Sequence, residues 1–322
     1  MLYPLTFHPI FKERVWGGRN LARLYHKPLP PDVRIGESWE ISDRPGDVSV
    51  VAEGALAGKD LHWLMETHSA ELLGAAKSEH GRFPLLIKIL DAQETLSVQV
   101  HPPAGKARAL GGEPKTEMWY VADAAPGAAL YVGLKRGATR DEFERRLNDG
   151  TVAECIHRVK VRPGDAMFLP SGRVHALGGG LVIFEIQQNS DTTYRVFDWN
   201  RMGLDGKPRD LHIQKSLASI DFNDFEPALL EGKPVGTGPV KVRTLVHDPL
   251  FTVEVCEAAV GATLPLAPRR PQIIAVLTGQ VQVGEEGATV ALLAGQFCLI
   301  PACLAQAVVR AASATSFLRV EA

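Results

Sequence analysis

Short apolar runs separated by turn residues dominate the pattern of hydrophobic and polar positions along the chain. Most runs have the roughly four to eight residues typical of strands, and glycine and proline interrupt them at close intervals. Many short strands bounded by turn signals favour a mainly β fold of the sandwich or barrel kind. The runs expected to form strands are Trp39–Ser42, Val48–Val51, Leu85–Leu90, Leu96–His101, Glu117–Ala122, Ala128–Val132, Ala166–Leu169, Leu181–Gln187, Ile273–Thr278 and Gln296–Ile300.

Helical patterns are fewer. One begins at Leu61–Met65 and continues toward Leu73, and the other covers Arg140–Asn148. Thr139 precedes the second pattern and acidic residues follow it, as is typical of a helix N-terminus. The sequence therefore predicts a small number of helices beside the β structure.

A connection rich in glycine and proline divides the chain at residues 226–240. Such composition marks a loop or linker, and β-type patterns return after it and continue to the end. We therefore expect a first domain at residues 1–230 and a smaller β domain at residues 240–322.

An internal repeat supports this division. In Gly164–Pro170, glycine and proline stand six positions apart around an apolar run, and Gly295–Pro301 repeats that spacing. Glycine permits the turn that begins such a unit, and proline ends the strand ladder. Five residues after its proline the first unit has His175, whereas the second has Gln306. A metal site that uses this histidine is therefore expected in the first domain alone.

Composition excludes several classes of partner. The formal net charge of the 322 residues is −2 without a long basic block, which argues against nucleic-acid or membrane binding driven by positive charge. No apolar run reaches the roughly 18–20 residues of a membrane helix, and the first residues lack the pattern of a signal peptide. The four cysteines are scattered and form no CxxC pair. We therefore expect a cytoplasmic protein with reduced thiols.

Two predicted strands carry polar side chains suited to a functional site. Ser97, Gln99 and His101 alternate with valines and so share one face of their strand. Lys115 and Glu117 are also two residues apart and share a face. A polar, metal-capable face opposite an apolar one suits a strand that lines a site.

The turn at Pro170–Gly172 brings in a further candidate ligand, His175. Taken alone, any one of these histidines is more often an ordinary hydrogen-bonded residue than a ligand. Together, two imidazole nitrogens, a carboxylate oxygen and an amide oxygen suit zinc, with manganese, iron or nickel also possible. The predicted ligands are Gln99, His101, Glu117 and His175.

The same segments resemble the cupin superfamily. Gly164–His175 has the spacing of the second cupin motif, and Gln99–His101 followed by Glu117 resembles the first, with glutamine in place of its first histidine. This substitution, within Gln-x-His-Pro and Lys-x-Glu, is similar to type I mannose-6-phosphate isomerases of the short bacterial form. Further similar runs are Pro9–Lys12, Val15–Gly18, Ile35–Glu40, Phe83–Lys88 and Gln188–Arg195.

This resemblance implies two cupin-type (jelly-roll) β-barrels, of which the second has no metal site. It implies one zinc ion per chain, a sugar phosphate as substrate, and interconversion of mannose 6-phosphate and fructose 6-phosphate through an enediol. It makes Arg195 the catalytic arginine and places Ser97, Lys115 and Glu185 in the substrate pocket. Arg201 stands where longer members have a phosphate-binding lysine, a difference that keeps the charge.

Aldose–ketose isomerisation needs a base beside C1 and C2 and positive groups for the developing oxyanion. Glu185, Lys115 with a pKa lowered by a nearby metal cation, and a ligand-associated histidine are all candidates for the base. Arg195 stays cationic and can stabilise the oxyanion. Two other functions also fit a metal-bearing cupin: an iron-dependent oxygenase, and a non-catalytic sugar-binding protein with a structural metal.

Overall fold

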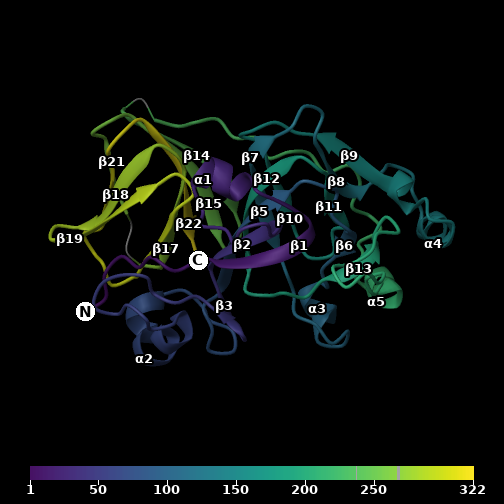
Figure 1. The fold of residues 1–322 in the computed structure, drawn as a ribbon, viewed down its shortest axis with the longest axis horizontal. Helices are drawn as coiled ribbons and strands as arrows, with labels where there is room; N and C mark the ends of the chain where they lie inside the picture. The colour runs from purple at the N-terminus through teal and green to yellow at the C-terminus, as the bar shows by residue number, and fades with distance from the viewer. Residues whose placement is uncertain (237, 267–268) are drawn as a thin grey trace.

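Strands far outnumber helices in the computed structural model, which describes residues 1–236, 238–266 and 269–322 (Figure 1). This confirms the mainly β class. Both predicted helices form with the expected bounds, and the Thr139 side chain caps the second by accepting from the Glu142 backbone N–H. The helices are α1 (Asn20–Tyr25), α2 (Leu61–Leu73), α3 (Ala104–Ala107), α4 (Arg140–Asn148), α5 (Ile213–Ser219) and the 3-10 turn η1 (Val152–Cys155).

The first part of the chain forms two antiparallel sheets, here called sheets I and II. Neighbours in each sheet come from distant parts of the sequence, so the order does not follow the chain. Sheet I runs β1 (Ile10–Gly18), β2 (Ile35–Ile41), β5 (Leu85–Ala92), β12 (Leu181–Gln188), β7 (Glu117–Ala124) and β10 (Ala166–Leu169). Sheet II runs β13 (Tyr194–Phe197), β6 (Val98–Val100), β11 (His175–Leu177), β8 (Ala129–Leu134) and β9 (Ile156–Lys160).

The last part forms sheets III and IV, coloured green to yellow at the left of Figure 1. Several of their strands lie outside the runs that the sequence predicted, because their short apolar patterns are broken by charged residues. Sheet III runs β14 (Val240–His247), β15 (Thr252–Ala258), β22 (Thr315–Glu321), β17 (Gln272–Thr278) and β20 (Phe297–Ile300). Sheet IV runs β16 (Thr263–Pro265), β21 (Val308–Ala311), β18 (Gln280–Glu285) and β19 (Ala288–Leu293), and β3 (Asp43–Arg44) pairs with β4 (Asp47–Val48).

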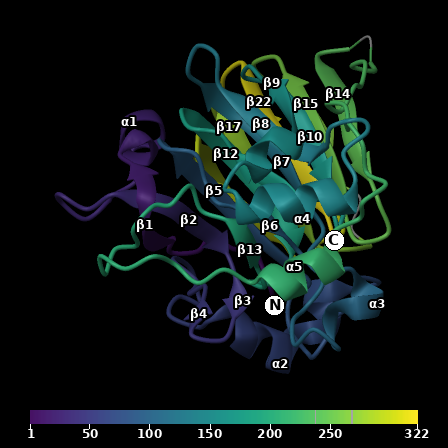
Figure 2. The ribbon, with the colours of Figure 1, turned by 90° about the vertical axis from the view of Figure 1, so that its right-hand side faces the viewer.

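The sheets stack as layers in the order IV, III, I and II, with α4 and α5 outside sheet II and nearest the viewer in Figure 2. Strand β12 shows that sheet I contributes side chains to two hydrophobic cores, one on each of its faces. Ile183 packs with residues of sheet II, whereas its neighbours Phe184 and Ile186 pack with residues of sheet III. Successive side chains of a strand point to opposite faces of the sheet. A strand that is buried on both faces therefore has apolar residues at consecutive positions and not only at alternate ones.

The internal repeat occupies equivalent places in the two halves. Strand β10 follows Gly164 at the edge of sheet I, and β20 follows Gly295 at the edge of sheet III. Both glycines have a positive φ, 94° and 78° respectively. Each glycine N–H also bonds to a valine carbonyl of the neighbouring strand, Val121 in one case and Val276 in the other. The two segments are therefore structural counterparts.

The two halves share apolar contacts. The core between sheets I and III contains Phe184 and Ile186 from the first half with Phe297 and Leu318 from the second. Leu5 in the first half also forms an isolated β-bridge with Leu299 in the second half. In the part of the chain that the structure describes, no sheet closes on itself into a barrel, and no helix has the length and apolar character needed to cross a membrane.

Candidate metal centre and active site

The candidate site lies between sheets I and II, where three strands of sheet II meet at Gln99. Gln99 on β6 pairs with His175 on β11 at one side and with Arg195 on β13 at the other. Directly opposed residues on neighbouring strands have Cβ atoms about 5 Å apart. His101 follows β6, and Glu117 begins β7 on the facing sheet I. Antiparallel pairing thus brings together side chains that are far apart in the sequence.

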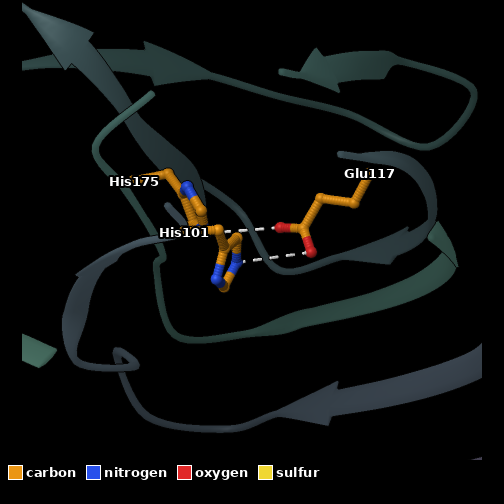
Figure 3. Close-up of side chains that lie close together, drawn as sticks. All are labelled: His101, Glu117 and His175. Atoms are coloured by element: carbon orange, nitrogen blue, oxygen red, sulfur yellow. Dashed lines mark ion pairs between the residues drawn. The ribbon is translucent and has the colours of Figure 1, made fainter. Parts of the chain in front are cut away.

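Three of the predicted ligands converge on one point (Figure 3). Their nitrogen and oxygen atoms all lie within 4.8 Å of one another, and all three side chains are buried. Glu117 Oε2 is 3.5 Å from His101 Nε2, and Glu117 Oε1 is 3.3 Å from His175 Nε2. These three side chains therefore present two nitrogens and a carboxylate to a common centre.

Both histidines are held in the neutral form that binds metals. Burial lowers the pKa of His175 to about 3, and burial followed by the charge of Lys115 lowers that of His101. The Nδ1 atom of His101 lies 2.8 Å from the Thr192 carbonyl oxygen, and that of His175 lies 2.9 Å from the Arg173 carbonyl oxygen. Each Nδ1–H donates to its carbonyl, which leaves the Nε2 lone pair directed at the centre.

The residues present fit a metal ion. His101 Nε2 and Glu117 Oε1 are buried without a hydrogen-bond partner among the described residues, and such groups are costly unless something binds them. The Gln99 side-chain nitrogen is 3.3 Å from His175 Nε2, so a half-turn of this amide offers its oxygen as a fourth ligand. Two nitrogens and two oxygens form a set that zinc accepts.

Lys115 supplies the positive charge beside Glu117. Its Nζ is 2.9 Å from Glu117 Oε2, and both side chains are buried. Burial raises the pKa of Glu117, but Lys115 and His101 outweigh burial and hold it well below its ordinary value. Burial lowers the pKa of Lys115, but Glu117 and then Glu185 outweigh it and raise that pKa. In the metal-free protein these carboxylates keep Lys115 an ammonium, and a lowered pKa of Lys115 beside a bound metal cation stays a prediction.

A cavity of about 590 Å³ opens beside this centre. Gln99 and Lys115 belong to its wall and also contact His175 and Glu117, so they connect the cavity with the convergent ligands. Ser97, Glu185 and Arg195 also line it. Arg201 does not: its guanidinium donates to the Thr95 carbonyl and to Asp198.

Several cavity residues were not predicted as site residues. Lys88 and Glu37 lie 3.6 Å apart, and Arg14 binds Glu37 at 2.7 Å. Lys88 also lies 3.4 Å from Glu185, its cross-strand partner. A lysine inside the otherwise apolar run Leu85–Leu90 is the signal that identifies this position, because a buried charge needs a partner.

Glu185 stands in the middle of the sheet I wall. Its carboxylate accepts from Trp119 Nε1 at 2.9 Å. Burial raises the pKa of Glu185 above its ordinary value; Lys115 opposes this effect and Glu117 adds to it. A carboxyl group with a raised pKa beside a cavity is suited to proton transfer.

A second, larger cavity of about 1300 Å³ lies elsewhere, at the junction of the two halves. Its wall includes Arg44, Arg82, Arg270 and the C-terminal Ala322. Within the described ranges, none of the predicted site residues belongs to this wall. The chemistry-bearing side chains therefore gather at the smaller cavity.

Comparison with known proteins agrees with this arrangement. Residues 5–127 match the family model of the phosphomannose isomerase type I catalytic domain. A probable mannose-6-phosphate isomerase of Bacillus subtilis, GmuF, is 36% identical over 305 residues, which cover 94% of each chain. A mannose-6-phosphate isomerase of Streptococcus mutans is 35% identical over 94% of this chain and 93% of its own.

Solved structures give the same result. The crystal structure of a mannose 6-phosphate isomerase from Bacillus subtilis superimposes with a TM-score of 0.89 and 31% identity, and covers 99% of both chains. A structure from Salmonella typhimurium, at 17% identity and a TM-score of 0.79, shows that the fold persists at low identity. The chain therefore belongs to the type I phosphomannose isomerase family, a family of aldose–ketose isomerases.

Proposed function

We propose that this protein is a zinc-dependent isomerase that interconverts mannose 6-phosphate and fructose 6-phosphate. The observation that carries the proposal is the convergence of His101, Glu117 and His175 beside a cavity whose wall contains lysine and arginine side chains. A buried cluster of neutral histidines and one carboxylate suits a divalent cation. The wall carries five cationic and five carboxylate side chains, and its lysines and arginines are the groups that can bind a phosphorylated substrate.

The proposed ligands of one zinc ion per chain are Gln99, His101, Glu117 and His175. When bound, the metal would polarise the oxygens at C1 and C2 of the sugar and so stabilise the negative charge that develops there. The backbone carbonyls of Arg173 and Thr192 fix the two imidazole rings by accepting from their Nδ1–H groups. Such partners orient ligands and raise metal affinity.

Glu185 is the proposed proton-transfer group. Removal of the proton at C2 and its return at C1 pass through an enediol, and the group that carries it must lie at the cavity surface. Glu185 does so, and its pKa is raised by burial. Lys115 is proposed to play a different part, because its Nζ lies 2.9 Å from Glu117 Oε2. Its ammonium can then hold Glu117 in place and add positive potential.

Arg195 and Ser97 are proposed to act on the sugar from sheet II. Arg195 lines the cavity and pairs with Gln99 across strands β13 and β6, and its fixed positive charge can stabilise the oxyanion of the enediol. Ser97 lies two residues before Gln99 on the same face and offers a hydroxyl to the sugar. A contact between Arg201 and the substrate phosphate stays a prediction made from the sequence.

The finer description of the fold is also a proposal. We propose that sheets I and II form one cupin-type barrel, that sheets III and IV form a second without a metal, and that residues 1–230 and 240–322 are the corresponding domains. The matched turn-strand units after Gly164 and Gly295 support this division. A small sugar phosphate as the partner, and a cytoplasmic location, follow from the proposed metabolic role.

The test is turnover of mannose 6-phosphate, measured by coupling fructose 6-phosphate formation to a reporter enzyme. Activity is expected with zinc, is expected to be lost after EDTA treatment, and is expected to return on adding zinc back. A folded, zinc-loaded protein without turnover would refute the proposal. Oxygen consumption with bound iron would favour the oxygenase instead, and sugar binding without turnover would favour the non-catalytic protein.

A further inference from the structure

A buried glutamine stands beside the candidate metal centre without being one of its predicted ligands. Gln187 is fully buried near the end of β12 and lies directly opposite Glu117 on β7. Side chains two apart on a strand share a face, so Gln187 lies on the same face of sheet I as Glu185, which lines the cavity. Gln187 therefore belongs to the surroundings of the metal centre, although the sequence did not mark it as a site residue.

The side-chain amide of Gln187 holds the turn that follows β12, residues 188–192. Its Nε2 donates to the Gln188 carbonyl oxygen at 2.9 Å and to the Ser190 carbonyl oxygen at 2.6 Å. Within the turn, the Ser190 N–H donates to the Gln188 carbonyl at 2.7 Å, and the Ser190 hydroxyl accepts from the Thr192 N–H at 3.2 Å. One side chain thus fixes two carbonyls of the turn.

The turn delivers the backbone partner of one predicted metal ligand. The Thr192 carbonyl oxygen lies 2.8 Å from His101 Nδ1 and accepts the bond that fixes this imidazole. His175 donates instead to the Arg173 carbonyl, which belongs to another segment of the chain. The contacts that begin at Gln187 therefore lead to His101 and not to His175.

The orientation of the amide also points to this role. The NH₂ group must face the two carbonyls, because an amide oxygen in its place could not donate to them. As a result, Gln187 Oε1 is buried without a hydrogen-bond partner among the described residues. A buried acceptor without a donor is destabilising. An apolar side chain of the same length would avoid this cost but would leave the carbonyls of Gln188 and Ser190 without the amide donor.

We propose that Gln187 is a positioning residue of the metal centre, which aligns His101 through the turn 188–192. The inference rests on the proposed function, because His101 is a ligand of the proposed zinc ion. Without the amide, the turn is free to shift and the Thr192 carbonyl moves with it. The His101 ring then loses its fixed orientation, whereas the ring of His175 keeps its own.

The test compares three variants of the full chain: Gln187→Met, Ser190→Ala and Thr315→Val. The first removes both N–H donors at nearly constant side-chain length, and the second removes only the hydroxyl that accepts from Thr192. Thr315→Val is the matched control. Thr315 is 6% exposed in sheet III, and its hydroxyl donates to the Thr278 carbonyl at 2.6 Å. Its loss removes a comparable buried bond away from the site.

The main readout is proton NMR of the metal-free protein with isotope-labelled histidine. The wild type is expected to show hydrogen-bonded Nδ1–H signals for His101 and His175, assigned with His101→Gln and His175→Gln. In Gln187→Met the His101 signal is expected to shift or disappear, and in Ser190→Ala to shift less, while the His175 signal stays in place. In Thr315→Val both signals are expected to stay.

An unchanged His101 signal in Gln187→Met would overturn the inference. Equal changes at His101 and His175 would also overturn it, because they indicate a general loosening of the site. If Gln187→Met does not fold by circular dichroism, Ser190→Ala decides with the same two signals. A change confined to His101 then supports the inference, and an unchanged His101 signal overturns it.

The second readout is zinc affinity, measured by competition with a chelator. Gln187→Met is expected to bind zinc about tenfold more weakly, at the lower end of the effect of removing a partner that orients a ligand. Thr315→Val is expected to keep the wild-type affinity. Equal zinc affinity in wild type and Gln187→Met would contradict the proposed positioning role.

The NMR readout separates this inference from the proposed function, because it needs neither metal nor turnover. If the wild-type protein has no turnover, the proposed function fails, and the His101 signal still decides the role of Gln187. If the wild-type protein is active and Gln187→Met leaves the His101 signal unchanged, only the present inference fails.

Discussion

Replacing Lys115 with methionine tests the electrostatic balance of the proposed metal centre. Lys115 Nζ lies 2.9 Å from Glu117 Oε2, with side chains 5% and 0% exposed. Methionine keeps the length of the apolar stem but removes the charge, so the Glu117 carboxylate loses its counter-charge in a buried place. Removing one partner of a buried ion pair costs about 3–5 kcal/mol. We expect the metal-free variant to lose about that much free energy of unfolding.

Zinc is expected to reverse most of this loss. A divalent cation bound to Glu117 supplies the positive charge that Lys115 supplies in the metal-free protein. In the wild type the two cations repel each other, whereas in Lys115→Met the metal has no competitor. The variant should therefore bind zinc more tightly than the wild type. Each tenfold gain in affinity adds about 1.4 kcal/mol of extra stabilisation at saturating zinc.

The assay is urea unfolding followed by circular dichroism, in EDTA and in a zinc buffer. Lys106→Met is the matched control, because Lys106 is exposed and donates only to the Ala218 carbonyl among the residues described; its loss should stay within about 0.5 kcal/mol. Two results would refute the reasoning: a loss below about 1 kcal/mol for Lys115→Met in EDTA, or equal stabilisation of wild type and variant by zinc.

Three further predictions concern proton transfer, pH and packing. Glu185→Gln should lower kcat by about 100-fold or more in steady-state assays, since it removes the proton acceptor but keeps the Trp119 contact; a loss below about tenfold would contradict this role. Burial raises the pKa of Glu37, but Lys88 and Arg14 outweigh it and lower it from 4.5 to about 2. Its charged form therefore contributes about 3 kcal/mol of stability above pH 4.5, lost as the pH falls toward 2. The stability difference from Glu37→Gln should shrink accordingly between pH 7 and pH 3, and a constant difference would contradict the assignment. A Cβ on Gly17 would lie 2.5 Å from Gly36 N, so Gly17→Ala should destabilise by about 1–3 kcal/mol, whereas Gly105→Ala, with open space around it, should not; thermal melts compare the two.

The sequence predicted those parts of the site that depend on local periodicity. Gln99 and Ser97 share a face of the chain and both line the cavity, and Lys115 and Glu117 touch, as the two-residue spacing indicated. The helix Arg140–Asn148 and its cap also follow from local rules. The alternation of side chains within a strand does not depend on which strands lie beside it. These predictions could therefore be made from the sequence before the fold was known.

Features that depend on long-range pairing could not be predicted in this way. The partners of Lys88 are Glu37 and Glu185, which come from different strands on either side of it. The order of the strands in sheet I determines these contacts, and the sequence around Lys88 does not specify that order. The same holds for Arg209, which lies in an irregular segment without periodicity and reaches the cavity through its bond to Asp198.

Anomalous diffraction at the zinc edge, from crystals of the zinc-loaded protein, tests the central claim most directly. One strong peak per chain is expected between His101 Nε2, His175 Nε2 and the Glu117 carboxylate, at about 2.0–2.2 Å from each, with the Gln99 side-chain oxygen turned toward it. A peak elsewhere, or well-ordered side chains without a peak between them, would contradict the proposed metal centre and the mechanism built on it.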